Sequence, residues 1–490
     1  MDDAVATRPN QPLDPSLNRP SSSRRLSDSA RHIVALAWPV FIGQVAVLAF
    51  GTIDTLLAAR YASLDLAALA IGGAVYITIF VGLMGAILAI GPVVGQLYGA
   101  SRLEDAGEQL HQTIWLALMI SVLGCALLLF PEPFLALSKA SPEVAVKVRG
   151  YLHALAFALP ASLMFTAFRG FNTAVSRPKV VMAIQLGGLA LKVPLSAMFV
   201  FGVEVPVPGS LGGPWQVPSM GAPGCGVATA IVMWCQLFLA WQMVRRDAFY
   251  LPFKVNGRPL SRPDWPSLRA LLKLGVPMGL SILVEVTGLT FMAFFISRIS
   301  QTAVAGHQIA ANMVALLYMM PLALANASST LVAQRIGAQD NAGARRIGWH
   351  GLFIGIATAA VLGSAVLLSR QWLVRIYTQD PLVIAAALPL VAWVAVFHLA
   401  DAAQALASFV LRAWRVATVP LLIYCFAIWG VGLGGGFSVA FNLTGLTPAP
   451  LQGAPGFWFA STVGLAVAAA GLCAFLLWVM RKSGGLRASP

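Results

Sequence analysis

Twelve long apolar segments run along the chain, and they constrain its fold more than any other feature. A helix of about 20 residues spans the roughly 30 Å hydrocarbon core of a bilayer, and each segment reaches that length. Hydrophobic residues make up 58% of the chain and charged residues only 10%, against about 25% in soluble domains. We therefore predict an all-α polytopic membrane protein with transmembrane helices at 32–59, 66–95, 109–130, 147–168, 180–202, 222–244, 270–297, 303–334, 347–369, 382–411, 417–440 and 456–480.

The basic residues predict how these helices are oriented. The chain holds 32 Lys and Arg, of which 24 fall in the tails and loops on the side of the two termini and seven on the opposite side. Because cytoplasmic loops of membrane proteins are rich in Lys and Arg, both termini are predicted to be cytoplasmic. The net charge of +14 is spread over these short loops and forms no continuous stripe, so we expect no nucleic-acid partner.

The second half of the chain repeats features of the first at an offset of 238 residues: Pro39 falls on Pro277, and VVGQLYGA at 93–100 resembles LVAQRIGA at 331–338. Six helices per repeat predict two parallel, pseudo-symmetric six-helix lobes, with a cleft between them suited to alternating access. The predicted order is a disordered cytoplasmic tail at 1–31, an N-lobe at 32–244, a cytoplasmic linker at 245–269, a C-lobe at 270–482 and a cytoplasmic tail at 483–490.

Three carboxylates lie deep in the apolar segments. Glu285 is the only ionisable residue of 274–297, with eleven residues before it and twelve after, which predicts a position near the bilayer midplane. An acid there costs roughly 2.5–3.5 kcal/mol and by default marks an ion or substrate pathway. Asp54 in the first segment and Asp401 in the tenth are also deep. Together they favour cation binding, and the alternative for each is a hydrogen bond between packed helices.

Other polar residues accompany these acids. His398 lies three residues before Asp401 and Gln404 three after it, on about the same helical face. Gln308 and Asn312 stand four residues apart in the eighth segment and are either ligands or partners in packing hydrogen bonds. The sequence lacks a nucleophile elbow, a metal-ligand spacing of His or Cys and a large extramembrane domain, so we expect neither an enzyme nor a cofactor.

Lys192 is the one Lys or Arg deep inside a predicted span, with twelve residues of 180–202 before it and ten after. It is too deep to reach either surface easily, so it must lose its proton or face a carboxylate. Asp54 is the only deep acid in the same half. We therefore expect an Asp54–Lys192 pair that substitutes for a bound cation and leaves ion coupling to Glu285 and Asp401. Alternatively, Lys192 gives up its proton as cargo or protons enter, and the pair is a switch.

Four motifs occur in order along the chain, WPVFIGQVAVLAFGTIDTLLAARYASLDLAALAIG, LVEVT, AGHQIAANM and DAAQALASFVLRA. Together they resemble the multidrug and toxin extrusion (MATE) family, in its NorM-like branch, from about residue 32 to 480. The resemblance implies a monomeric antiporter of the bacterial cytoplasmic membrane that exports amphipathic organic cations, including drugs and toxic metabolites, against Na⁺ or H⁺. It matches Asp54, Glu285 and Asp401 to the family's coupling acids, of which Glu285 and Asp401 would bind Na⁺.

The remaining site residues follow from the polar pattern and the family together. We place Lys192, His398, Gln308, Asn312, Phe397 and Gln44 at the substrate cavity. Two of these depart from the family pattern: Lys192 stands where relatives commonly have an Asn, and Phe397 where NorM-like members can have a Tyr. The first departure affects the cation site of the first lobe, and the second removes a hydroxyl ligand from the site of the second lobe.

A flippase for lipid-linked oligosaccharides, from the same superfamily, is the alternative function. Such a protein must hold a pyrophosphate, which calls for several intramembrane Arg or Lys. Deep in the predicted spans one Lys opposes three acids, which favours cationic cargo.

Overall fold

The computed structural model describes residues 26–138, 140–205, 215–255 and 260–485, and within these ranges twelve helical segments are long and apolar enough to cross a membrane. The predicted all-α polytopic fold is confirmed. The first half contains α1 (Leu26–Tyr61), α2 (Ser63–Leu88), α3 (Ile90–Gly99), α4 (Leu103–Leu129), α5 (Glu132–Ser138), α6 (Pro142–Ala174), α7 (Pro178–Phe201), α8 (Ala222–Arg246) and a 3-10 turn, η1 (Ala248–Phe253). The second half contains α9 (Trp265–Ile296), α10 (Gln301–Gly337), α11 (Asn341–Tyr377), α12 (Pro381–Ala413), α13 (Thr418–Tyr424), the π-helix η2 (Cys425–Gly434), α14 (Gly435–Ala440), the 3-10 turn η3 (Ala449–Leu451) and α15 (Ala454–Gly485).

Most helices extend beyond the predicted apolar spans. The side chains of Asp264, Ser300 and Asp340 accept hydrogen bonds from backbone amides three residues further on, so capping starts α9, α10 and α11 in polar sequence that an apolar run does not mark. Helix α1 already begins at Leu26, which corrects the predicted tail for residues 26–31, and residues 1–25 lie outside the described chain. At the other end α15 reaches Gly485, and 486–490 are likewise outside.

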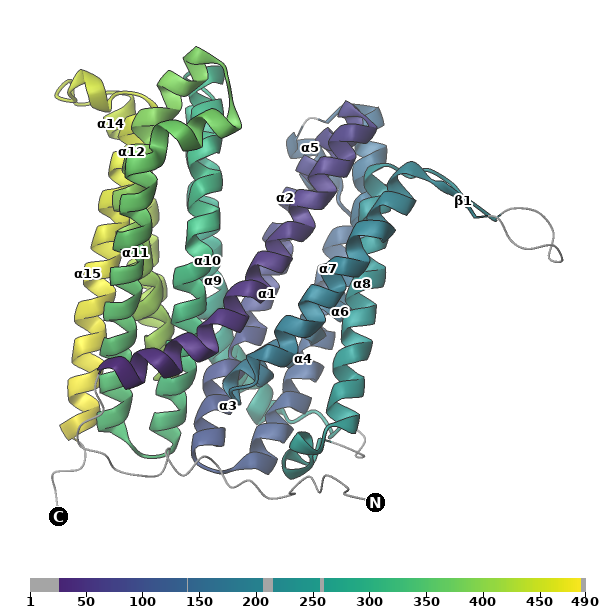
Figure 1. Ribbon diagram of the computed structural model, residues 1–490, viewed down its shortest axis with the longest axis vertical. Coiled ribbons are helices and arrows are strands. Elements are labelled where there is room, and N and C mark those ends of the chain that lie inside the picture. Colours follow the sequence, from purple (N-terminus) through teal and green to yellow (C-terminus); the bar gives the residue numbers. More distant parts are fainter. Residues whose placement is uncertain (1–25, 139, 206–214, 256–259, 486–490) are drawn as a thin grey trace, which may run out of the picture.

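Two short strands were not predicted. Strand β1 (Val203–Val205) pairs antiparallel with β2 (Trp215–Val217) between α7 and α8, with Val203 opposite Val217. Figure 1 shows this hairpin projecting from the end of the first bundle that also carries α5.

The helices form two bundles with separate cores, which confirms the predicted lobes (Figure 1). Two helices cross between them. Leu268, Leu271 and Leu274 at the start of α9 pack into the core of the first lobe, whereas Ile33 and Ala37 at the start of α1 pack into the core of the second. The core of each lobe is therefore completed by the first residues of a helix that belongs to the other lobe.

The lobes approach each other closely where α3 packs against α10. A Cβ atom on Gly99 would lie 1.9 Å from the carbonyl oxygen of Gln334, and one on Gly337 would lie 1.9 Å from that of Gln96. Gly95 and Gly99 allow this close packing, and their partner is a helix of the opposite half.

The two glutamines at this contact also donate across it in matching ways. Gln96 donates to the carbonyl of Ala413 at the end of α12, and Gln334 donates to the carbonyl of Ala174 at the end of α6. Each hydrogen bond is 2.8 Å long. The repeated residues of the two halves thus form one reciprocal lock, which closes the molecule at the end where α3 lies (Figure 1).

We expect Gly99→Ala to open this lock. The new methyl group would displace backbone atoms of α10, and overpacking of this kind costs about 1–3 kcal/mol. Spin labels at Arg102 and Ala342, exposed residues of the two halves beside the lock, should report a longer distance by pulsed electron resonance. Gly91→Ala on the same helix is the control, because nothing lies within 4 Å of its Cβ position. An unchanged distance distribution in Gly99→Ala would show that the lobes do not separate there.

Candidate functional site

A cavity of about 520 Å³ lies between the two lobes, a size typical of small-molecule sites. Most of its wall is apolar, with side chains such as Phe80, Met84, Met319 and Leu322. Four charged residues stand among the described residues that line it: Arg169, Glu285, Asp401 and Arg412. The cavity therefore offers an apolar volume with a few fixed charges of both signs.

Glu285 and Asp401 are brought together by a third side chain. The amide nitrogen of Gln404 donates to Glu285 Oε1 at 3.0 Å and to Asp401 Oδ1 at 2.9 Å. An amide NH₂ group has two hydrogens, so one nitrogen can serve both carboxylates. The oxygen of Gln404 accepts from the hydroxyl of Tyr424. Gln404 is fully buried and thus ties α9, α12 and α13 together behind the acids.

Oxygen atoms dominate this corner of the cavity. Tyr318 also lines it and interacts electrostatically with Glu285 and Asp401. Two carboxylates with neighbouring hydroxyls suit a hard cation such as Na⁺, or a proton. Phe397 lines the cavity as expected, and the hydroxyls that it lacks are present on Tyr318 and Tyr424. Across the described ranges, no group of three or more His, Cys, Asp and Glu could hold a metal ion.

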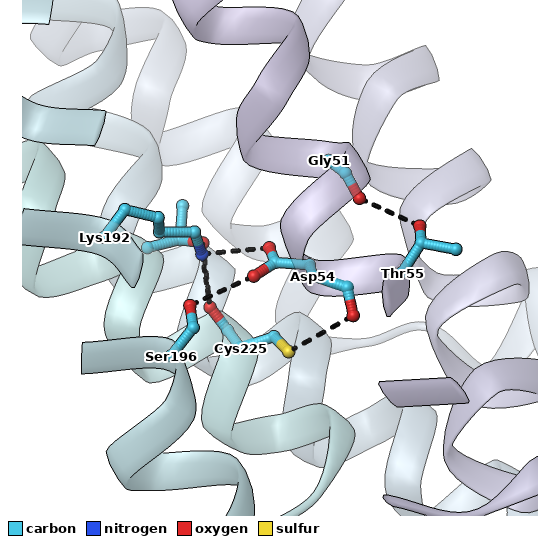
Figure 2. A network of polar contacts seen from close by, with 7 residues as sticks. Gly51, Asp54, Thr55, Lys192, Ser196 and Cys225 are labelled. Atoms are coloured by element: carbon cyan, nitrogen blue, oxygen red, sulfur yellow. Dashed lines mark hydrogen bonds and ion pairs between the residues drawn. The ribbon is translucent and has the colours of Figure 1, made fainter. Parts of the chain in front are cut away.

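Asp54 and Lys192 form the predicted pair (Figure 2). Lys192 is fully buried, and its Nζ lies 2.9 Å from Asp54 Oδ2, 3.1 Å from the Cys225 carbonyl and 2.5 Å from Thr229 Oγ1. An ammonium has three donors, so all of them are used. Ser196 donates to the other Asp54 oxygen at 3.1 Å. Figure 2 shows these groups converging from α1, α7 and α8.

Several residues that we predicted at the cavity lie elsewhere. Lys192 is outside its lining, enclosed within the first lobe beside Asp54. His398 is fully buried away from it, and neither ring nitrogen has a partner within the described chain. Gln308 and Asn312 are exposed on α10 and hydrogen-bond to each other at 3.4 Å. Gln44 does line the cavity.

Two cavity residues, Arg169 and Arg412, were not predicted. The predicted spans end at 168 and 411 and leave both in cytoplasmic loops, whereas they lie inside α6 and α12, which continue past them to Ala174 and Ala413. The expected excess of acids over cations is therefore wrong for the cavity, because two acids and two arginines line it. The repeat could have found them, since Arg169 followed by Pro178 resembles Arg412 followed by Pro420.

Comparisons with known proteins show which family the chain resembles. The sequence model of the MatE family matches the chain twice, at residues 39–198 and 277–437. The matches begin at 39 and 277, so they are offset by the 238 residues of the internal repeat.

Relatives match almost the whole chain. It is 37% identical over 95% of its length to the "Probable multidrug resistance protein NorM" of Aromatoleum aromaticum, 97% of which is covered. It is 33% identical over 94% of its length to the "Multidrug resistance protein NorM" of Vibrio cholerae, also with 97% covered. The fold is similar to the crystal structure of the eukaryotic MATE transporter AtDTX14, with a TM-score of 0.81 at 17% identity, over 94% of this chain and 98% of the other. This chain therefore belongs to the MATE family of membrane transporters, in its NorM-like branch.

Proposed function

We propose that this protein exports amphipathic organic cations, such as drugs and toxic metabolites, from the cytoplasm by antiport with Na⁺ or H⁺. The observation that carries the proposal is the pair of carboxylates, Glu285 and Asp401, at an apolar cavity between two lobes. The names of the multidrug resistance relatives support it. Both lobes that line the cavity belong to one chain, so a monomer can act alone.

Competition for the same carboxylates would couple the two fluxes. A proton or Na⁺ at Glu285 and Asp401 neutralises the charge that attracts a cationic drug, so the ion and the drug bind in turn. Gln404 and Tyr424 link the site to three helices, and a change of occupant alters their hydrogen bonds. Exchange follows if the lobes change orientation only when one of the two is bound.

The basic residues indicate how the protein is oriented in the membrane. With both termini in the cytoplasm, the lock between α3 and α10 faces the cytoplasm, and this conformation is the outward-facing one. The protein would then lie in the bacterial cytoplasmic membrane. The Asp54–Lys192 pair keeps its own cation inside the first lobe, which leaves ion exchange to the second lobe.

Oligosaccharide flipping is the weaker candidate. A lipid-linked pyrophosphate brings several negative charges and needs a surplus of cations. The charges of Arg169 and Arg412 are matched in number by Glu285 and Asp401, so the cavity has no surplus among its described lining residues.

Reconstitution in liposomes tests the proposal. A fluorescent organic cation should move across the membrane when a Na⁺ or an H⁺ gradient is imposed, and the effective gradient names the coupling ion. Protein-free liposomes are the control. If neither gradient moves the dye more than it moves through protein-free vesicles, the antiport proposal is wrong.

A further inference from the structure

We propose that Arg412 and Arg169 form an anion-binding subsite at the closed end of the cavity, so that the preferred cargo is a zwitterionic amphiphile whose carboxylate meets these guanidinium groups. The inference rests on the proposed export function and defines its substrate class.

The two arginines lie near the ends of α12 and α6, one in each lobe. Arg412 directly precedes Ala413, and Arg169 lies five residues before Ala174. Those two alanines accept the reciprocal hydrogen bonds of the lock between the lobes. The arginines therefore line the cavity just inside its closed end, one from each side.

Neither arginine has an anionic partner in the structure. Within the described residues, no carboxylate lies within 4 Å of either side chain. Arg412 is only 6% exposed and rests on the ring of Phe409, with 4.2 Å between the guanidinium carbon and the ring centroid. A guanidinium nitrogen of Arg169 donates a long hydrogen bond, 3.7 Å, to the sulfur of Met84. Arg169 is half-buried, whereas Arg412 is almost completely buried, and a buried guanidinium is costly unless an anion or hydrogen-bond acceptors reach it.

The position of these residues near helix C-termini accounts for only part of their presence. The helix dipole favours cations in the last turn, but it does not determine whether the side chain points into the cavity. Both side chains nevertheless reach the cavity wall, where a planar guanidinium can bind a carboxylate through two parallel hydrogen bonds.

The two acids line the cavity from the second lobe, as Arg412 does, and Asp401 lies further from the closed end than Arg412. Asp401 is eleven residues before Arg412 on α12, which is about three helical turns and nearly the same face. Glu285 is close enough to attract Arg412 electrostatically, yet it forms no ion pair with it in the described chain. One amphiphile can thus place its cationic group at Glu285 and Asp401 and its carboxylate at the arginines, and the cavity stays neutral.

Two dyes that differ by one ester group test this subsite. Rhodamine B carries a carboxylate and a delocalised cation, and its methyl ester keeps only the cation. With purified full-length protein in detergent, fluorescence anisotropy should show that Arg412→Gln weakens rhodamine B binding about tenfold, the loss expected for one charged hydrogen-bonding partner, and changes ester binding less than about twofold. Arg169→Gln should act in the same sense, and Arg412→Lys should lie between Gln and the parent.

Arg415→Gln is the matched control, because Arg415 is an exposed arginine three residues further on and outside this cavity. Equal weakening of both dyes by Arg412→Gln, or a gain for the ester with no change for rhodamine B, would overturn the subsite. If Arg412→Gln does not fold, Arg412→Lys and Arg169→Gln decide the question alone. Driven transport of the ester in liposomes reports on the export function separately, so the subsite can fail while that function stands.

Discussion

Glu285→Gln and Asp401→Asn are each expected to abolish ion-driven export while the protein still folds. Each change keeps the size of the side chain and its capacity to accept from Gln404, but it removes the charge for which ion and cargo compete. Transport should fall at least about a hundredfold, since one lost charge at a partly desolvated site is worth about 3 kcal/mol or more. The measurement is dye movement in liposomes under the effective gradient, with thermal unfolding as the test of folding.

A matched control comes from an acid outside the cavity. Glu143 is exposed at the start of α6, and Glu143→Gln should transport like the parent. Full exchange by both carboxamide variants at normal protein levels would show that coupling resides elsewhere, and Asp54 would then be the next candidate.

Lys192→Met is expected to destabilise the protein severely. It leaves Asp54 buried with Ser196 as its only remaining side-chain donor of normal length, and breaking a buried pair from one side costs about 3–5 kcal/mol. Asp54→Asn should be harmful for the converse reason, because it strands a buried ammonium. The double variant should be closer to the parent than either single one. Thermal unfolding in detergent measures all four proteins.

The exposed pair of Arg102 and Asp105 provides the control for this cycle. Its side chains are 64% and 51% exposed, and Arg102→Met should cost no more than about 1 kcal/mol. Strictly additive losses from Asp54→Asn and Lys192→Met would mean that the two charges do not depend on each other. Asp54 would then remain available as an exchangeable ion site.

The parts of the fold that could be predicted are those that composition records locally. Twelve spans follow from twelve apolar runs, and the Asp54–Lys192 pair follows because a lone charge in lipid needs a partner from the same lobe. The ends of the helices could not be predicted as well. Capping by Asp264 or Asp340 prolongs a helix through polar sequence, whereas an apolar run marks only the part inside the membrane.

The site was harder to predict because it depends on how distant helices cross. Gln404 was noted beside Asp401, but its bond to Glu285 joins residues 119 positions apart. Arg412 was assigned to a loop because it stands near the end of an apolar run, and only the full length of α12 places it at the cavity. His398 was assigned to the face of Asp401, yet three residues along a helix turn a side chain by about 60° from that face, and this is enough to point it into the packed interior.

The crossing of α1 and α9 has a consequence for how the protein is made. The core of the first lobe needs Leu268, Leu271 and Leu274, so it stays incomplete during synthesis until α9 leaves the ribosome. A half-length chain would lack those side chains, unless a second copy lent its own first helix in exchange. The single-repeat ancestor of such a chain would accordingly be a dimer with swapped helices, and gene fusion would have turned an exchange between two subunits into a crossing within one.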